Sequence, residues 1–252
     1  MLSTLYAVLF YVATILLVVG TLMKVAKYAR TPAPLKIPVH PAPRTKKGVV
    51  LRMGREVLFF ESLFKSNRWI WVFGFLFHWG MLLVLLRHLR YFTQPVWWWV
   101  ELIQPFGIYA GFAMVAGLLG LLARRIVVER IRYISSPSDY LMLLLIIGIG
   151  VTGLGMKFVL PVDIIAVKAF FLGLMRFQIL DLPAQPAILI HLGLVALLMI
   201  IFPISKLIHA PGLFFAPSRT QVDNAREFRH LSAWASQLPP LPEGIPTKEE
   251  GK

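Results

Sequence analysis

The stretch FHWGMLLVLLRHLRYF, residues 77–92, places two histidines, His78 and His88, in a segment otherwise apolar enough to lie in lipid. A polar side chain inside the hydrocarbon layer costs free energy and usually has a specific partner or function. The stretch therefore predicts a membrane-spanning helix whose histidines have partners of their own.

The composition of the whole chain indicates an integral membrane protein. Of its 252 residues, 58% are hydrophobic and 15% are charged. The net charge of +14 does not indicate nucleic acid, because the basic residues cluster beside apolar runs rather than along one soluble face. The absence of cysteine excludes disulfides, thiolate-held metals, iron–sulfur clusters and covalently attached haem. Any redox centre must therefore be held by other ligands.

Five apolar runs are long enough to cross about 30 Å of hydrocarbon as helices. These runs are residues 2–23, 69–86, 106–123, 140–156 and 187–204. The first run has no basic leader and is too long for a signal peptide, so it is expected to be a retained span. The expected class is an all-α integral membrane protein with a five-helix membrane domain over residues 1–210 and a cytoplasmic tail over residues 211–252.

The loop charges predict the orientation in the membrane. Residues 24–68, 124–132 and 206–252 hold 21 of the 26 lysines and arginines, and five spans place all three segments on one side. Basic residues concentrate on the cytoplasmic side of membrane proteins. We therefore expect an outside N-terminus, a cytoplasmic C-terminus and a location in a prokaryotic inner membrane.

Two connecting segments carry helical patterns outside the spans. Residues 49–69 alternate an apolar face with a charged face, which predicts one helix lying at the membrane surface or docked on the protein. The proline-rich loop before it is expected to be extended. The loop of residues 157–186 contains a second possible surface helix.

Four of the six histidines lie in or at the ends of the second and fifth spans: His78, His88, His191 and His209. The two spans run antiparallel, which pairs His78 with His209 at the inner level and His88 with His191 at the outer level. Two facing neutral imidazoles suit the axial positions of a haem iron. Interhelical hydrogen bonding is the simpler alternative for any single histidine. One zinc ion cannot collect all four, because His191 and His209 lie about 27 Å apart along a straight helix.

The two histidine spacings do not match for straight helices. Eighteen residues return a helix to the same face, whereas ten residues leave it about 80° out of register. A bend at Pro203 could absorb the difference. Arg87, Arg90 and Lys206 flank the histidines and could meet haem propionates, or they could be ordinary interfacial anchors.

The histidine-bearing segments FHWGMLLVLLRH and HLGLVALLMIIFPISKLIH resemble the second and fifth spans of the nitrate reductase gamma-subunit family, five-helix cytochromes b with two b-type haems. GREVLFFESLF, VDIIAVK and FPISKLIHAPGLFFAPSR are more similar to the DsrM family of cytochrome b subunits in sulfite-reduction-associated (Dsr) electron transfer complexes. Subunits of heterodisulfide-reductase-like quinol complexes look similar. The resemblance implies that His78 and His209 ligate an inner haem, and His88 and His191 an outer one.

The same resemblance implies menaquinone as the membrane carrier and a cytoplasmic iron–sulfur partner of the heterodisulfide-reductase type. Other membrane and periplasmic subunits of a sulfur-metabolism respiratory complex would complete the assembly. The nitrate reductase branch has a quinol-associated lysine near the outer start of the third span, and ELIQPFGIYAGF offers none.

Quinol oxidation requires a proton acceptor near the outer haem. The outer-side candidates are Glu101, Asp163, Lys168 and Asp181, and each could equally be a solvated loop charge.

The expected function is that of an electron-transfer subunit exchanging electrons between menaquinol and a cytoplasmic partner. The alternative is a haem-free membrane anchor or a proton-coupled transporter that uses its intramembrane histidines.

Overall fold

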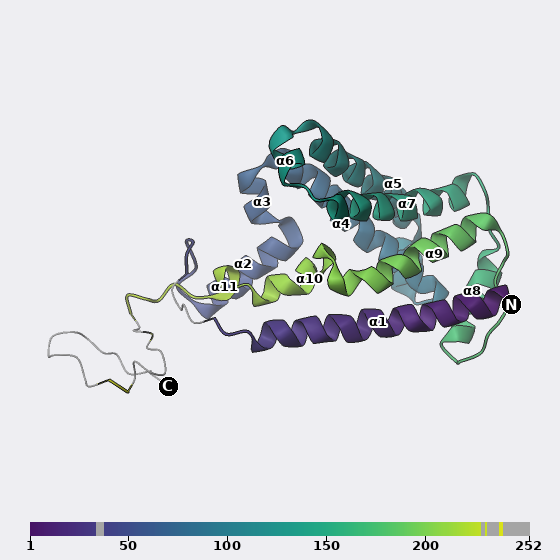
Figure 1. The fold of residues 1–252 in the computed structure, drawn as a ribbon, viewed down its shortest axis with the longest axis horizontal. Helices are drawn as coiled ribbons and strands as arrows, with labels where there is room; N and C mark the ends of the chain where they lie inside the picture. The colour runs from purple at the N-terminus through teal and green to yellow at the C-terminus, as the bar shows by residue number, and fades with distance from the viewer. Residues whose placement is uncertain (34–37, 228–229, 231–236, 239–252) are drawn as a thin grey trace. The chain divides into compact units, whose positions relative to one another are not determined.

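A computed structural model of the chain describes residues 1–33, 38–227, 230 and 237–238 (Figure 1). All regular secondary structure in these residues is helical. The main helices are α1 (Leu2–Arg30), α2 (Lys46–Phe59), α3 (Glu61–Ser66), α4 (Arg68–His88), α5 (Trp98–Val127), α6 (Glu129–Ile134), α7 (Pro137–Phe158), α8 (Ile164–Leu174) and α9 (Pro186–Ile201). Shorter pieces are η1 (Leu89–Tyr91), η2 (Phe202–Ile204), η3 (Lys206–Ile208), α10 (His209–Gly212), η4 (Leu213–Phe215) and α11 (Pro217–Thr220).

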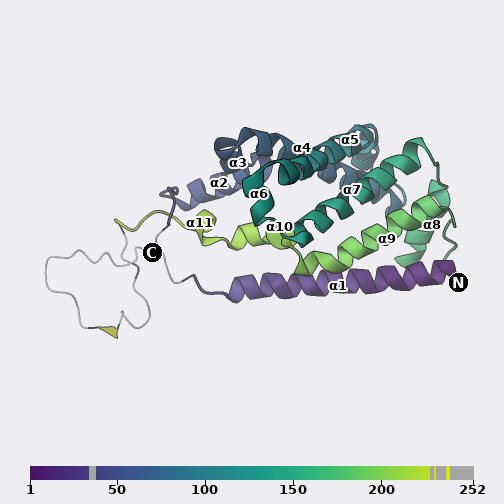
Figure 2. The same ribbon diagram turned by 45° about the horizontal axis from the view of Figure 1, so that its top comes forward.

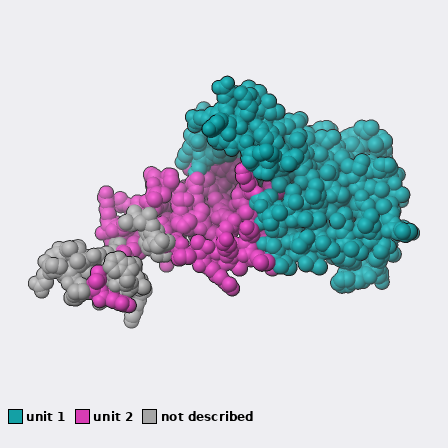
Figure 3. Space-filling model, viewed as in Figure 1, with its two compact units in different colours: residues 1–20, 62–205 teal, residues 21–61, 206–252 magenta. Residues whose placement is uncertain are grey.

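The chain forms two compact units, which Figure 3 distinguishes by colour. Unit 1 comprises residues 1–20 and 62–205, and unit 2 comprises residues 21–61 and 206–252. Much of the expected cytoplasmic tail beyond residue 227 lies outside the described residues.

The five expected spans are confirmed as five helices long and apolar enough to cross a membrane. They cover Leu2–Arg30, Arg68–Tyr91, Trp98–Val127, Pro137–Phe158 and Pro186–Ile204. The third span begins well before the expected residue 106, because α5 continues through Pro105. Helices in membranes tolerate an interior proline because neighbouring groups can satisfy the freed carbonyl.

Glycines allow α4 and α5 to pack at very close range. A methyl group at Gly117 would lie 2.6 Å from the Phe73 carbonyl oxygen, and one at Gly80 would lie 2.7 Å from the Ala110 carbonyl oxygen. Small residues at such positions let helix backbones approach closely in lipid, where packing drives association. Helix α5 also packs against α7, and α7 packs against α9, so that α4, α5, α7 and α9 lie side by side in that order (Figure 2).

Helix α8 closes one end of unit 1, near the N-terminus (Figures 1 and 2). Its Phe170 is completely buried, and Phe171 packs edge-on against Phe10 of α1 with ring centroids 5.3 Å apart. The Tyr11 hydroxyl donates to the Leu174 carbonyl at 2.9 Å. The helix expected in this loop is present, and it buries one face in the core while Ile164 and Ile165 stay exposed.

The expected amphipathic segment forms two helices rather than one, α2 in unit 2 and α3 almost wholly in unit 1. Thr45 caps the start of α2 by accepting from the Gly48 amide at 3.1 Å. Helix α2 ends where Phe60 adopts a left-handed conformation, with φ 50°. An ion pair between Arg219 and Glu56, 3.1 Å apart, ties α11 to α2.

Candidate cofactor-binding site

Helix α4 carries two of the four candidate ligands on one continuous rod. His78 lies in its middle, half-buried, and His88 is its last residue. Ten residues of helix separate them along the axis by about 15 Å. The two histidines therefore lie at different depths of the same span, as the sequence predicts.

Three of the histidines donate a ring hydrogen to a carbonyl of their own helical turn. The Nδ1 atoms of His78, His88 and His209 lie 2.7 Å, 2.6 Å and 2.9 Å from the carbonyl oxygens of Gly74, Val84 and Lys206. A carbonyl oxygen only accepts, so Nδ1 carries the proton and the neutral ring has its lone pair on Nε2. This is the tautomer in which a histidine ligates iron through Nε2 while a second group orients the ring.

His191, on α9, reaches the same tautomer by a different route. It is buried, and its Nδ1 lies 2.9 Å from the hydroxyl oxygen of Thr152 on α7. That hydroxyl lies 2.7 Å from the Gly148 carbonyl and 3.1 Å from the Ile149 carbonyl, and a hydrogen pointed at His191 instead would leave oxygen lone pairs facing both carbonyl oxygens. Thr152 therefore accepts from His191, and the neutral ring carries its lone pair on Nε2, as in the other three histidines.

The donor set fits haem iron at each of the four positions. Neutral imidazoles with an oriented Nδ1–H are the axial ligands of b-type haems. His88 and His191 both belong to unit 1, and their pairing at an outer haem stays a prediction. His78 belongs to unit 1 and His209 to unit 2, so that pairing stays a prediction.

The fifth span is interrupted where the sequence expects a bend. Helix α9 ends at Ile201, the segment around Pro203 is a short 3₁₀ turn, and Ser205 is extended with φ −96° and ψ 174°. A new short helix begins at His209. The interval between His191 and His209 is therefore not one straight helix, and the estimate of about 27 Å between them does not apply.

The two arginines beside His88 are held in place by an amide that sequence reasoning missed. Arg90 donates to the Gln104 side-chain oxygen at 3.0 Å, and the Gln104 amide group donates to the Arg87 carbonyl at 3.3 Å. The Arg87 side chain lies against Gly107, where a methyl group would be 2.6 Å from Cδ. Gln104, a polar amide just before the apolar run of residues 106–123 and on the same side as Arg87 and Arg90, was the available signal.

Lys206, the third cation expected near the histidines, contacts His209 through its backbone, because its carbonyl accepts the His209 ring hydrogen.

The four quinol-site candidates lie on separate elements. Glu101 is in the first turn of α5, Lys168 is half-buried on α8, and Asp181 is exposed in the segment before α9. Asp163 caps α8 by accepting from the amides of residues 165 and 166 at 2.9 Å and 3.1 Å. No hydrogen bond or ion pair joins any two of the four within the described residues, so a common site stays a prediction.

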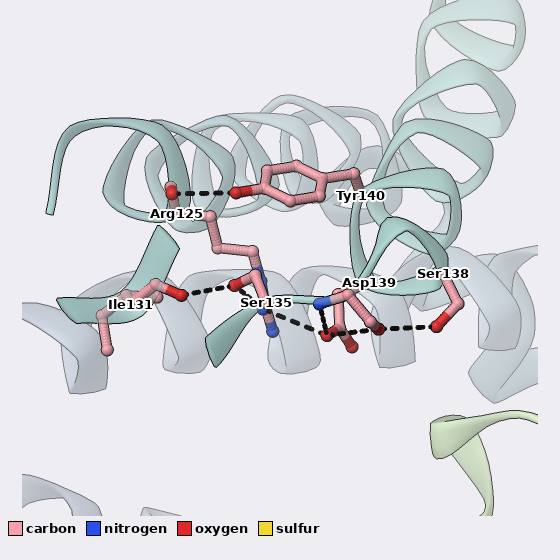
Figure 4. Close-up of polar contacts among 7 residues, drawn as sticks. Arg125, Ile131, Ser135, Ser138, Asp139 and Tyr140 are labelled. Carbon is pink, nitrogen blue, oxygen red and sulfur yellow. Dashed lines mark hydrogen bonds and ion pairs between the residues drawn. The ribbon is translucent and has the colours of Figure 1, made fainter. Parts of the chain in front are cut away.

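A second polar cluster lies at the turn between α5 and α7, and Figure 4 shows its members. Arg125 donates to the Ser135 hydroxyl at 2.7 Å and lies 3.7 Å from the carboxylate of buried Asp139. Asp139 also accepts from the Ser136 amide at 2.9 Å, and the Tyr140 hydroxyl donates to the Arg125 carbonyl at 3.1 Å. The sequence signal was the capping box formed by Ser136 and Asp139.

No three histidine or acidic side chains converge on one point in the part of the chain that the structure describes. A tetrahedral zinc site made from side chains needs such a group. The ligand role of the four histidines stays a prediction.

Residues 60–225 match the family model of the nitrate reductase gamma subunit. A relative from Archaeoglobus fulgidus, named Hdr-like menaquinol oxidoreductase cytochrome b-like subunit, shares 33% identity over 93% of this chain and 85% of its own length. A protein of the same name from Archaeoglobus profundus shares 31% identity over 89% of this chain and 80% of its own. The chain is a multi-pass membrane protein and belongs to the nitrate reductase gamma-subunit family.

Proposed function

We propose that this protein is a membrane cytochrome b subunit with two haem b groups, which carries electrons between menaquinol and a cytoplasmic iron–sulfur partner. The observation that carries the proposal is the protonation pattern of the four histidines. Each has Nδ1 bonded to an acceptor, three on carbonyls and one on a hydroxyl, which puts the lone pair of the neutral ring on Nε2, the atom that would ligate iron. The relatives named as menaquinol oxidoreductase cytochrome b-like subunits support the same role.

His88 and His191 would hold the outer haem, and His78 and His209 the inner one. When bound, haem iron supplies reversible one-electron transfer. The chain supplies the ligands, fixes the ring orientations and keeps water away from the apolar spans. Arg87 and Arg90 would meet the propionates of the outer haem and Lys206 those of the inner one.

Menaquinol oxidised to menaquinone loses two electrons and two protons. The electrons would pass inward to the partner, and the protons would leave at the outer side. Glu101 and Asp181 are the best acceptors among the four candidates, because both are exposed carboxylates without a hydrogen bond among the described residues. The half-buried Lys168 could donate to a quinone oxygen, whereas Asp163 already caps α8.

The partner would be an iron–sulfur subunit of the heterodisulfide-reductase type, docked on the basic cytoplasmic side. The orientation rests on the distribution of lysine and arginine, with 21 of 26 on the three segments assigned to that side. A Dsr-like or Hdr-like respiratory complex of sulfur metabolism in a prokaryotic inner membrane is the corresponding assembly, with further membrane and periplasmic subunits. The resemblance of the segment GREVLFFESLF to the DsrM family supports the Dsr-like form.

A reduced-minus-oxidised spectrum of the purified full-length protein tests the proposal. We expect a b-type alpha band and about two haems per chain. A protein that is folded and monodisperse in detergent but shows no Soret absorption would instead be a haem-free anchor or a proton-coupled transporter, and the proposal would be wrong.

A further inference from the structure

The four histidines differ in what holds them. His78, His88 and His209 donate to carbonyls within their own helical turns, whereas His191 donates to a side chain on another span. We infer that Thr152 is a positioning residue for His191, and that its hydroxyl fixes the ring's tautomer and orientation and thereby the redox potential of the outer haem. This inference rests on the haem-binding function proposed above.

The hydrogen-bond geometry gives the direction of each bond at Thr152. Its single hydroxyl hydrogen is directed to the Gly148 carbonyl at 2.7 Å or the Ile149 carbonyl at 3.1 Å, since a hydrogen turned toward His191 would leave the hydroxyl oxygen in unrelieved repulsion with both carbonyl oxygens. The contact of 2.9 Å to His191 Nδ1 must then be a bond from the ring to the hydroxyl oxygen. Because the hydroxyl is anchored to the backbone of α7, it holds the ring at a fixed position.

The neighbouring residue on α7 provides the space that this ring needs. A methyl group at Gly153 would lie 3.3 Å from Cε1 of His191, closer than most carbon contacts. Thr152 and Gly153 therefore act on one imidazole, the first by holding Nδ1 and the second by leaving room beside Cε1. The fourth span, which carries none of the four candidate ligand histidines, thus takes part in the outer site.

The acceptor of an imidazole N–H also affects the metal. Donation from Nδ1 raises the basicity of the ring, and a more basic ligand stabilises ferric over ferrous iron. Losing the acceptor weakens the ligand and raises the midpoint potential. Removal of such an outer partner typically lowers metal affinity by about 10- to 100-fold. Each tenfold loss of haem affinity that is confined to the ferric form raises the midpoint potential by about 59 mV for a one-electron couple.

The test compares Thr152→Val with Thr152→Ser in the full-length protein. Valine keeps the shape but removes the oxygen, whereas serine keeps the hydroxyl. A matched control is Thr21→Val on α1, because the buried Thr21 hydroxyl has no hydrogen-bond partner among the described residues. Haem content and redox titrations are measured for all three variants, and the His88→Ala variant identifies which wave belongs to the outer haem.

We expect Thr152→Val to raise the outer midpoint or to lower outer haem retention by about tenfold or more. The inner midpoint should not move, and Thr152→Ser and Thr21→Val should resemble the unmodified protein. An unchanged or lowered outer midpoint with full haem content overturns the inference, as does a serine variant that behaves like valine. Absence of haem from the unmodified protein would instead overturn the proposed function, so the two failures are distinguishable.

Discussion

Two polar groupings of unit 1 use their hydrogen-bonding groups in opposite ways. At the turn between α5 and α7, Arg125, Ser135, Asp139 and Tyr140 form an α5–α7 polar cluster whose donors and acceptors satisfy one another. At the His88–His191 site, each imidazole has one nitrogen bonded within the chain, and its second nitrogen has no hydrogen bond among the described residues. The first arrangement satisfies its own polar groups, whereas the proposed haem would complete the second.

The difference gives a physical criterion for function in a membrane protein. Buried polar groups are almost always paired, since an unpaired one costs about 1 to 3 kcal/mol. A polar cluster whose donors and acceptors pair with one another therefore needs no ligand, and a structural role accounts for it. A buried imidazole that is oriented but not fully satisfied, as in His191, is the pattern expected of a ligand, and its substitution should change cofactor content before it changes stability.

Replacement of His191 by alanine is the change with the largest expected effect. Because each haem needs two axial histidines, the variant should lose the outer haem and about half of the haem per chain. Haem content by pyridine haemochromogen assay and a reduced-minus-oxidised spectrum measure the loss. His40→Ala is the matched control, because His40 is exposed and lies outside the spans.

Loss of both haems in a His191→Ala protein that still folds would contradict the pairing of His88 with His191. Retention of both would contradict the ligand role of His191. Either result would also remove the distinction between the His88–His191 site and the α5–α7 polar cluster.

The spans could be predicted, and the candidate histidine ligands could be named, from the sequence because both depend on local composition. A run of apolar residues specifies a spanning helix whatever its neighbours are. Histidines stand out in such runs because burying them is costly. The interruption near Pro203 was also predictable, because proline cannot donate the helical hydrogen bond.

The partners of those residues could not be predicted, since they depend on how helices far apart in sequence face one another. Thr152 meets His191 across 39 positions, and Gln104 meets Arg90 across 14. The end of α2 at Phe60 had no glycine or proline to signal it. The burial of α8 depended on the face of α1 that covers it, which no pattern within residues 164–174 specifies.

Replacement of Asp139 by alanine should have the next largest effect and should change stability alone. The variant loses the capping box of α7 and leaves Arg125 without its carboxylate, for a cost of about 2 kcal/mol. Thermal unfolding in detergent should shift to lower temperature, while haem content and both midpoints stay unchanged. Glu129→Ala is the control, because that carboxylate is exposed on α6. A change in either midpoint would show that the α5–α7 polar cluster acts on a cofactor.

Gln104→Leu should have the smallest effect, although Gln104 lies beside the residues that flank His88. Its amide group donates to the carbonyls of Arg87 and Val100, and its side-chain oxygen accepts from Arg90. Its hydrogen-bonding groups are thus paired within the chain, as in the α5–α7 polar cluster. Loss of these bonds should cost about 1 kcal/mol, because the helical carbonyls keep their backbone partners. Haem content should be unchanged in this variant. The control is Gln178→Leu, which should change neither haem content nor stability, because Gln178 is exposed. A midpoint shift confined to the outer haem in Gln104→Leu would instead mean that Gln104 acts on the haem through Arg90, and the boundary of the His88–His191 site would then extend to α5.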